Sequence, residues 1–379
     1  MARLVAFGDA HLGRTHLAAL RDDQGRNLRE EDFLRSFDWA VEETLRQEPD
    51  GFVLLGDLFD HARPSYRVFT RVAVGLRKLS DAGLRGVAIS GNHDTPRLRG
   101  TGSPYATLEE FVPSVTFAWA MEATTADLAG LKVHAVPQTL DVGSFKEELE
   151  KAAGALDADA TNLLLAHVAL TSLPARAYPD INELEVSESE FDKRFDLIVL
   201  GHYHVYQKAS KRTWYAGSTD SFTFADRPNN KIGPKGLLLV DTEAGKVEHV
   251  ANPGERPLVT YGIDAGGMGP GELVHAVGLH NAELPGRAIV RVFLNEVDPA
   301  AFRQVPMEDF HEAMPAAAYV QVEPDFGAAA LAVQGAPTIG TLEQEWAGYI
   351  ESQDLAGLDR VRVKDLGERF LVEAKGEEP

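Results

Sequence analysis

The sequence predicts a layered α/β protein, and three observations support this prediction. Short apolar runs such as 4–7, 52–55 and 87–89 are continuous and partly β-branched, which is typical of strands buried on both faces. Segments such as 33–45, whose apolar residues recur at helical spacing, separate these runs. Polar residues with metal-binding side chains follow the ends of the runs. Strands that alternate with helices favour a parallel sheet covered by helices.

Five of the apolar runs in residues 1–252, the largest predicted domain, end in a polar cluster. The clusters are Asp9-Ala10-His11, Gly56-Asp57, Gly91-Asn92-His93-Asp94, Ala166-His167 and Gly201-His202-Tyr203-His204. Open α/β sheets place their ligands at the carboxyl ends of the strands. We therefore expect one active site, assembled at one edge of a sheet.

The residue types in these clusters predict a pair of divalent cations. A carboxylate can bridge two cations that lie about 3.5–4 Å apart, and Asp57 is the candidate bridge. Imidazoles suit manganese, iron or zinc better than magnesium or calcium. A single Gly-Asp is usually a turn and a single His is more often structural, but the ordered series favours a metal site. The candidate ligands are Asp9, His11, Asp57, Asn92, His167, His202 and His204.

The chain beyond the first domain is predicted to hold two smaller parts. Two prolines and a glycine in 252–257 mark a break. Residues 257–326 then combine strand-like and helical patterns in a small α+β domain. A segment rich in Gly, Ala and Pro, 327–337, is typical of a linker. Residues 338–375 carry amphipathic helical patterns, and we expect this region to dock onto another surface. The elements expected in 257–326 are strands at 258–263, 288–293 and 319–322 and helices at 272–279 and 307–314.

Composition limits the classes of function. With 58 acidic and 37 basic residues the formal charge is −21, which disfavours binding of a polyanion unless metals, local basic loops or a partner supply the attraction. The absence of cysteine excludes disulfides and thiolate metal sites and fits a reducing compartment. No apolar run approaches the ~20 residues of a membrane span, and the N-terminus lacks a signal-peptide pattern. A soluble cytoplasmic protein is expected.

The motif series D-x-H, G-D, G-N-H-D, a lone His and G-H-x-H resembles that of the calcineurin-like metallophosphoesterases, over about the first 240 residues. The resemblance implies a layered calcineurin-like sandwich with two metals. It implies that His93 stabilises the transition state or protonates the leaving oxygen, and that Asp94 orients its imidazole. The implied ligands are Asp9, His11, Asp57 and His204 for one metal, and Asp57, Asn92, His167 and His202 for the other.

The residues around the motifs are similar to those of the SbcD-type DNA double-strand-break repair nucleases. This resemblance implies a DNA-capping domain at 257–326 and, at 338–375, a helical region that binds an SbcC-type coiled-coil ATPase. It also implies a homodimer through the regions around 68–79 and 98–111, although packing on the sheet is the alternative for most of their apolar residues. The resemblance rests on Asp9-Ala10-His11-Leu12-Gly13, Arg29, Asp32-Phe33, Phe37, Gly56 to Asp60, Arg63-Pro64-Ser65, Tyr215 to Ser218 and Lys235-Gly236.

Basic residues that follow the motifs are candidates for DNA contact. Some relatives carry His at the position of Asp60, whereas this chain has His61 next to it, which is a substrate contact or an exposed loop residue. Each basic residue taken singly is more often a solvated side chain. The strongest candidates are His61, Arg63, Arg97 and Lys208, and the wider set adds Arg67, Arg99, Lys211 and Arg212.

The resemblance implies a manganese-dependent nuclease subunit acting in DNA repair, recombination and replication. The implied activities are 3′→5′ exonuclease action on double-stranded DNA and endonuclease action on single strands or hairpins. No Gly-x-x-x-x-Gly-Lys-Ser/Thr loop is present, so ATP hydrolysis would need another subunit. Two alternatives stay open: a small-molecule phosphodiesterase acting on cyclic nucleotides or nucleotides, which suits the negative charge better, and a non-catalytic scaffold, which the intact His93 disfavours.

Overall fold

The computed structural model describes residues 2–17, 20–98, 101–173, 183–226, 233–327, 341–352 and 359–375. The predicted linker 327–337 lies outside these residues except for Gly327. The chain divides into two compact units. The first comprises Met1–Tyr261, His275–Val292 and Met307–Val322, and the second Gly262–Val274, Phe293–Pro306 and Glu323–Pro379.

The first six-stranded sheet holds the strands that precede the first three motifs. β1 to β4 run parallel, and β13 and β14 continue the sheet beyond β1 in antiparallel fashion. The order is β14 (Lys246–Ala251), β13 (Gly236–Asp241), β1 (Arg3–Phe7), β2 (Gly51–Leu55), β3 (Gly86–Ile89) and β4 (Val115–Ala118).

A second six-stranded sheet holds the strands that precede the last two motifs. β6, β7, β10 and β12 are parallel, and the register pairs Gly201 directly with His167. The expectation of one sheet edge is therefore wrong: the motifs are divided between two sheets. The order is β11 (Gln207–Lys208), β12 (Thr213–Tyr215), β10 (Leu197–Gly201), β7 (Thr161–His167), β6 (Leu131–Val136) and β5 (Thr124–Leu128).

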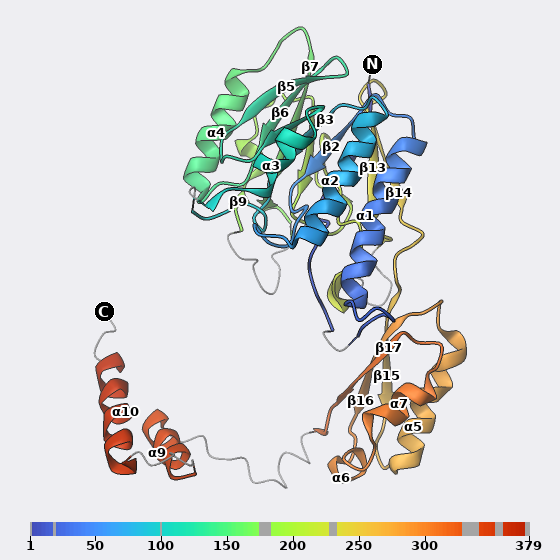
Figure 1. Cartoon of the computed structure of the whole chain (residues 1–379), viewed down its shortest axis with the longest axis vertical. Coiled ribbons are helices and arrows are strands. Elements are labelled where there is room, and N and C mark those ends of the chain that lie inside the picture. The colour runs from blue at the N-terminus through green and yellow to red at the C-terminus, as the bar shows by residue number, and fades with distance from the viewer. Residues whose placement is uncertain are drawn as a thin grey trace. The chain divides into compact units, whose positions relative to one another are not determined.

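The two sheets stack face to face because their strands are apolar on both faces. In β1, Leu4 and Ala6 join the cluster shared with the second sheet, whereas Val5 and Phe7 join the cluster shared with the helices. α1 (Leu28–Arg46), α2 (Tyr66–Asp81) and α3 (Pro104–Phe111) contribute to that helical cluster. α4 (Val142–Gly154) packs on the other face of the second sheet. The resulting α/β/β/α sandwich, visible in Figure 1, confirms the predicted fold class.

Short elements connect the layers of the sandwich. A two-stranded parallel ladder of β8 (Ala169–Leu170) and β9 (Glu185–Val186) follows β7. Single turns of 3-10 helix lie at Glu188–Glu190 and Phe224–Asp226.

α1 starts where the Asn27 side chain accepts a hydrogen bond from the Glu30 backbone amide at 3.1 Å, and Ser65 caps α2 in the same way through Val68.

A buried charge network ties α1 to later segments of the first unit. Arg29, which is fully buried, donates to Asp32 at 2.6 Å and to Asp220 at 3.2 Å. Arg256 donates to the same Asp32 carboxylate at 2.6 and 2.7 Å. The Ser36 hydroxyl donates to Asp220 at 2.6 Å. Breaking a buried ion pair leaves an uncompensated charge in the protein interior, so the charged side chains of this network stabilise one another.

The elements predicted in 257–326 are present within a few residues of their expected ends. β15 (Leu258–Asp264), β16 (Ile289–Asn295) and β17 (Tyr319–Pro324) form a three-stranded sheet in that order. The helices there are α5 (Pro270–Gly278), α6 (Pro299–Phe302) and α7 (Met307–Ala313), with a 3-10 segment at Leu279–Glu283.

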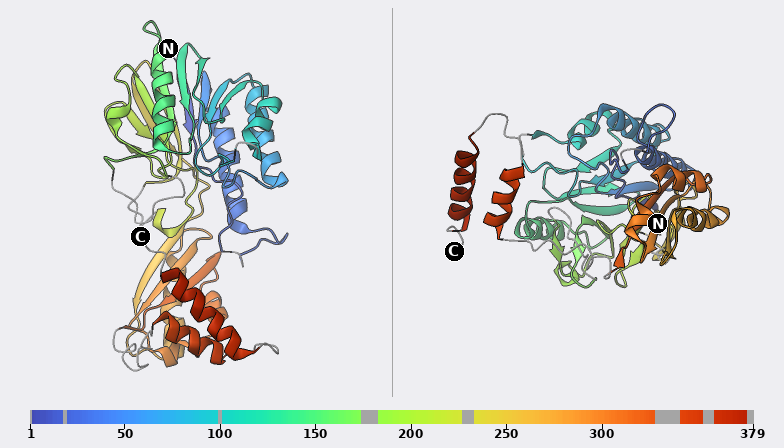
Figure 2. Two further views of the ribbon diagram at one scale, coloured as in Figure 1. Left: turned by 90° about the vertical axis from the view of Figure 1, so that its left-hand side faces the viewer. Right: turned by 90° about the horizontal axis from the view of Figure 1, so that it is seen from below.

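Two helices, α9 (Leu342–Ser352) and α10 (Arg360–Lys375), lie side by side near the C-terminus (Figure 2). The indole of Trp346 donates a hydrogen bond to the Lys364 carbonyl at 3.0 Å and so links the pair. Among the described residues, no helix is long and apolar enough to cross a membrane.

Candidate metal centre

The motif loops after β1 and β2 are joined by backbone hydrogen bonds. The amide of Asp9 donates to the Gly56 carbonyl at 3.0 Å, and that of His11 to the Asp57 carbonyl at 2.9 Å. On the second sheet, His167 is the last residue of β7, and His202 directly follows β10. The His202 amide donates to both oxygens of Asp9, at 3.0 and 3.1 Å. This contact links the motif loops of the two sheets.

Four of the seven candidate ligands have backbone angles that ordinary residues seldom adopt. Asp9, His11 and Asp57 have φ values of 46°, 42° and 47°, and His202 has a φ of 95°. Such conformations cost on the order of 1–3 kcal/mol each and persist where the surrounding structure enforces them. Their concentration at one place marks these turns as built for function rather than for stability.

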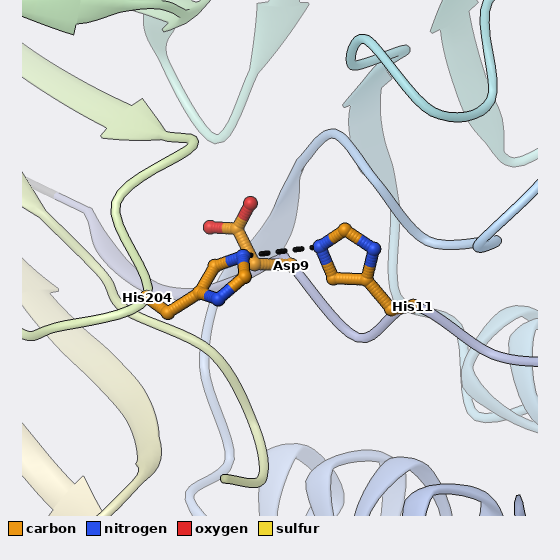
Figure 3. Close-up of side chains that lie close together, drawn as sticks. All are labelled: Asp9, His11 and His204. Carbon is orange, nitrogen blue, oxygen red and sulfur yellow. Dashed lines mark hydrogen bonds between the residues drawn. The ribbon is translucent and has the colours of Figure 1, made fainter. Parts of the chain in front are cut away.

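One group of ligands gathers around the imidazoles of His11 and His204. The two Nε2 atoms lie 3.1 Å apart, and Asp9 lies beside them, as Figure 3 shows. Asp57 Oδ2 is 3.7 Å from His11 Nε2. These four residues form the set that the resemblance assigned to one metal.

The second group shares Asp57 with the first. Asp57 Oδ2 lies 3.2 Å from His167 Nε2, and Asn92 Oδ1 lies 3.0 Å from the same nitrogen. His202 Nδ1 is 3.3 Å from Asn92 Oδ1. Asp57 thus lies between the two groups, as a bridging carboxylate would. The structure therefore brings all seven predicted ligands together.

Each imidazole is oriented through its other ring nitrogen, by residues that the sequence analysis missed. His11 Nδ1 lies 3.2 Å from Asp60, His202 Nε2 lies 3.0 Å from Glu183, and His204 Nδ1 lies 3.5 Å from Asp226. His167 Nδ1 donates to the Leu55 carbonyl at 2.7 Å. Only the tertiary structure reveals these partners: Glu183 and Asp226 come from segments without a motif, and the spacing of Leu55 and Asp60 around Asp57 does not show which imidazole they face.

The arrangement fits a pair of cations. When the outer nitrogens carry protons, the inner nitrogens present lone pairs to one another and to the Asp57 and Asn92 oxygens. A convergence of acceptor atoms is stabilised by positive charge at its centre. Three overlapping groups of Asp and His side chains lie close enough to hold a cation: Asp9, His11 and His204; His11, Asp57 and His93; and Asp9, Asp57 and His167. His93 is not among the ligands that the resemblance implies.

The electrostatics of the site reflect the same demand for positive charge. Burial opposes protonation of His167, but Asp57 and Asp9 outweigh it and raise the pKa of His167 to about 10. Burial tends to raise the pKa of Asp57, but His167 and His11 hold that pKa well below its usual range. Burial lowers the pKa of His204 to about 4, against the opposing effect of Asp226. A neutral His204 is the form that a metal requires.

His93 lies beside the first group, with its ring edge-on to that of His11 at a centroid distance of 4.6 Å. Its Nδ1 lies 3.1 Å from the backbone carbonyl of Asp60. The expected partner, Asp94, is turned elsewhere: its carboxylate accepts from the amides of Gly91 and Leu58 at 2.7 and 2.9 Å and from the Tyr105 hydroxyl at 2.8 Å. Asp94 therefore holds the motif loops together. The residue that lies beside the His93 ring is Asp60 and not Asp94.

Three of the four strongest DNA-contact candidates, His61, Arg63 and Arg97, lie around a cleft that starts at His93. His61 and Arg97 line a cavity of about 250 Å³ together with Asn92 and His93. They also line an adjoining cavity of about 350 Å³, to which Arg63 contributes.

Other basic residues of the wider set are engaged elsewhere. Lys208 lies over the Trp214 ring, with Nζ 4.9 Å from the centroid. Arg67 pairs with Glu30 and Glu31, and Arg212 donates to the Asp192 and Phe195 carbonyls at 2.8 and 2.7 Å. Arg67 and Arg212 thus serve the fold, and Arg99 lies outside the described residues.

Comparison with known proteins agrees with this geometry. A family model described as calcineurin-like phosphoesterase matches residues 2–206. The DNA double-strand break repair protein Mre11 of Methanopyrus kandleri is 30% identical over 260 residues, 64% of this chain and 54% of that protein. The Mre11 protein of Haloferax volcanii is 29% identical over 272 residues, 70% of this chain and 56% of that protein. The chain spans about half the length of these curated relatives.

Solved structures also align with this chain. The purple acid phosphatase PPD1 from yellow lupin (Lupinus luteus) seeds covers 65% of this chain and 52% of its own, with a TM-score of 0.41 and 13% identity. The resemblance inferred from the motifs is confirmed by the family match, which includes all five motifs. The chain belongs to the calcineurin-like phosphoesterase family and has Mre11/SbcD-type DNA repair nucleases among its homologues.

Proposed function

We propose that this protein is the manganese-dependent nuclease subunit of an SbcCD-type DNA repair complex. The proposed activities are 3′→5′ exonuclease action on double-stranded DNA and endonuclease action on single strands or hairpins. The observation that supports this proposal best is the convergence of seven ligand side chains beside His93, at the mouth of a cleft that carries His61, Arg63 and Arg97. The relatives' role in DNA double-strand break repair supports the choice of DNA.

Two bound cations would supply charge neutralisation and activation of water, with Asp57 as the bridge. The chain's own residues position the phosphodiester and move the proton. His93 Nδ1 donates to the Asp60 carbonyl, so we assign the proton transfer to the leaving oxygen to His93 Nε2. Arg63 and Arg97 would bind the phosphates next to the cleaved bond. Such local contacts, with the metals and a partner, offset the repulsion expected from a charge of −21.

The decisive experiment measures degradation of linear duplex DNA by the full-length protein with manganese, beside a His93→Ala variant. We expect degradation by the wild type, a loss of about 10²–10⁴-fold in kcat for the variant, and unchanged manganese binding. Arg67→Ala serves as a matched control, because its guanidinium pairs with Glu30 and Glu31. Equal activity of wild type and His93→Ala would remove the catalytic assignment.

The second candidate is a small-molecule phosphodiesterase, which the net charge of −21 favours. Hydrolysis of bis(p-nitrophenyl) phosphate tests the metal chemistry without DNA. A preparation that cleaves this diester and cyclic nucleotides, but leaves linear and hairpin DNA intact, would establish this alternative.

A two-fold homodimer through α2 and α3 is part of the proposal. An open cavity of about 600 Å³ lies between these helices and is lined mainly by apolar groups, including Phe69, Ala73, Val74 and Phe111. Val74 of α2 is 62% exposed and Phe111 of α3 is 59% exposed, whereas Val72 and Leu76 of α2 are buried in the core. Light scattering of wild type and Val74→Asp should give the mass of a dimer and of a monomer, respectively.

The binding site for an SbcC-type coiled-coil ATPase is proposed at 338–375. The described residues there expose an apolar set: Leu342, Tyr349, Val361, Leu366 and Phe370. An exposed apolar surface of this kind is typical of helices that pack on a partner. In this proposal, residues 1–252 form the nuclease domain and 257–326 the DNA-capping domain. The lack of cysteine favours a cytoplasmic location.

A further inference from the structure

The ring of Phe222 packs against two of the candidate metal ligands, His11 and His204. Phe222 is 1% exposed, and its ring centroid lies 5.0 Å from that of each imidazole, with interplanar angles of 76° and 72°. Both imidazoles belong to the group drawn in Figure 3, in which their Nε2 atoms lie 3.1 Å apart. One apolar side chain thus contacts both histidines of the same proposed metal.

These ring contacts restrict a motion that the polar contacts leave open. Asp60 lies 3.2 Å from His11 Nδ1, and Asp226 lies 3.5 Å from His204 Nδ1. An imidazole that is held at its Cβ and at one ring nitrogen can still tilt about the line between these two atoms. Edge-to-face packing on Phe222 limits this tilt. The direction in which each Nε2 lone pair points is therefore set by Phe222 as well as by the carboxylates.

The turn that carries Phe222 also carries the partner of His204. Asp226 Oδ2 accepts hydrogen bonds from the Phe222 amide at 3.2 Å, from the Thr223 amide at 2.7 Å and from the Thr223 hydroxyl at 3.0 Å. The other oxygen, Oδ1, faces His204 Nδ1. Because Asp226 closes the turn 222–226 on itself, the Phe222 ring and the carboxylate that orients His204 are held in a fixed relation to each other.

The second aromatic residue of this turn, Phe224, packs on β15 and β16 instead of the metal centre. Phe224 is 8% exposed and lies in a cluster with Leu20, Leu258 of β15 and Ile289 of β16. The guanidinium carbon of Arg291, also in β16, lies 4.5 Å from the centroid of the Phe224 ring, which adds a cation–π attraction. The turn therefore contacts the metal centre at one residue and these two strands two residues later.

We propose that Phe222 is a positioning residue for His11 and His204, and that Phe224 makes its position depend on the packing of β15 and β16. The proposal rests on the two-metal assignment but not on DNA as the substrate. Coupling between two equilibria is reciprocal. Manganese should therefore tighten the packing around Phe224 by the same factor by which that packing strengthens manganese binding. β15 and β16 would then influence the metal centre without supplying a ligand.

Manganese affinity of the metal-free, full-length variants tests the role of Phe222. Phe222→Leu keeps an apolar side chain in the core but removes the flat ring. The affinity should fall by roughly 10-fold, the lower end of the range for residues that orient a ligating histidine. Phe222→Ala should lower the affinity at least as much. Phe224→Leu should lower it by a smaller factor, because Phe224 acts through the turn and contacts neither imidazole in the pairs described above.

Phe145→Leu is the matched control. Phe145 is fully buried in the cluster between α4 and the second sheet. Electron paramagnetic resonance measures free manganese, and circular dichroism measures the unfolding temperature. Phe145→Leu and Phe222→Leu should both unfold at a lower temperature than the wild type, since each removes part of a buried ring. Only Phe222→Leu should bind manganese more weakly.

A double variant and hydrogen–deuterium exchange test the link through Phe224. Since Phe224 acts through Phe222, the variant with both Phe222→Leu and Phe224→Leu should lose less affinity than the product of the two single losses. In the wild type, manganese should slow exchange in the peptides that carry Leu258 and Ile289. Manganese should slow it less in Phe224→Leu.

The possible results are distinct. Wild-type manganese affinity of both Phe222 variants, or an equal loss in Phe145→Leu, would overturn the positioning role. Unfolding of both Phe222 variants would also overturn it and make Phe222 a structural residue. Independent losses in the double variant, or exchange at Leu258 and Ile289 that manganese does not alter, would overturn the link through Phe224. A wild type that binds no manganese would instead overturn the two-metal assignment on which the proposal rests.

Discussion

A methyl group added at Gly201 is expected to weaken metal binding although Gly201 is not a ligand. An ideal Cβ at this position would lie 2.0 Å from the Leu55 carbonyl oxygen and 2.8 Å from His167 Nδ1. These two atoms are hydrogen-bonded to each other at 2.7 Å. Because ordinary contacts begin at 3.4 Å, the carbonyl would have to retreat by about 1.4 Å, the difference between 3.4 and 2.0 Å. The hydrogen bond that orients His167 would then be lost.

The magnitude of the effect has two parts. Forcing a group into a packed interior costs about 1–3 kcal/mol of stability. Loss of the partner that orients a ligating histidine lowers metal affinity by roughly 10–100-fold. The matched control is Gly154→Ala at the end of α4, where an added Cβ has no atom within 4 Å. That substitution should leave both quantities near their wild-type values.

The assay is calorimetric titration of manganese into the metal-free full-length protein, with thermal unfolding monitored by circular dichroism. Gly201→Ala should unfold at a lower temperature than Gly154→Ala and bind manganese more weakly. If Gly201→Ala is folded and binds manganese as tightly as the wild type, the steric argument is refuted, and the His167 orientation does not depend on Leu55.

Three further predictions concern other parts of the first unit. Burial raises the pKa of Asp220 to about 6, although Arg29 acts in the opposite direction. Because the pKa of an aspartate in the unfolded chain is near 4, the wild type should lose about 3 kcal/mol of its free energy of unfolding as the pH rises from about 4 through 6. In urea unfolding, Asp220→Asn should lack this loss, and an identical pH dependence would contradict it. Arg97→Ala should raise the KM for DNA and lower the slope of the logarithm of DNA affinity against the logarithm of salt concentration by about one, whereas Arg67→Ala should change neither. Equal effects of the two substitutions would argue against DNA binding in the cleft. Tyr105→Phe removes a donor to buried Asp94, so thermal unfolding should reveal a loss of about 1–3 kcal/mol, and an unchanged midpoint would argue against that hydrogen bond.

The sequence was most informative where chemistry and strand ends coincide. The convergence of the candidate ligands Asp9, Asp57 and His167 could be predicted because each follows a buried apolar run and carries a donor atom suited to a transition metal. The small elements between 257 and 326 were found within a few residues because their apolar periods change clearly at Pro and Gly.

Prediction failed where a role depends on which of several neighbours a side chain faces. Asp94 follows His93 in the chain, but its carboxylate points to Tyr105 and the motif loops, and Asp60 lies beside His93 instead. Glu183 and Asp226 lie in loops without any motif, so no sequence signal set them apart from other acidic residues. Rotamer and loop geometry, which decide such contacts, are not encoded in spacing.

The sequence alone determined the layered α/β class, the choice of seven candidate metal ligands and the exclusion of a thiolate site. Only the tertiary structure decided that the ligands come from two stacked sheets, which outer partner orients each imidazole and which basic residues face the cleft at His93. The physical reason is the separation along the chain over which each property acts. Burial period and side-chain chemistry are local properties of a chain, whereas the stacking of the two sheets brings together residues more than a hundred positions apart, such as Leu55 and His167.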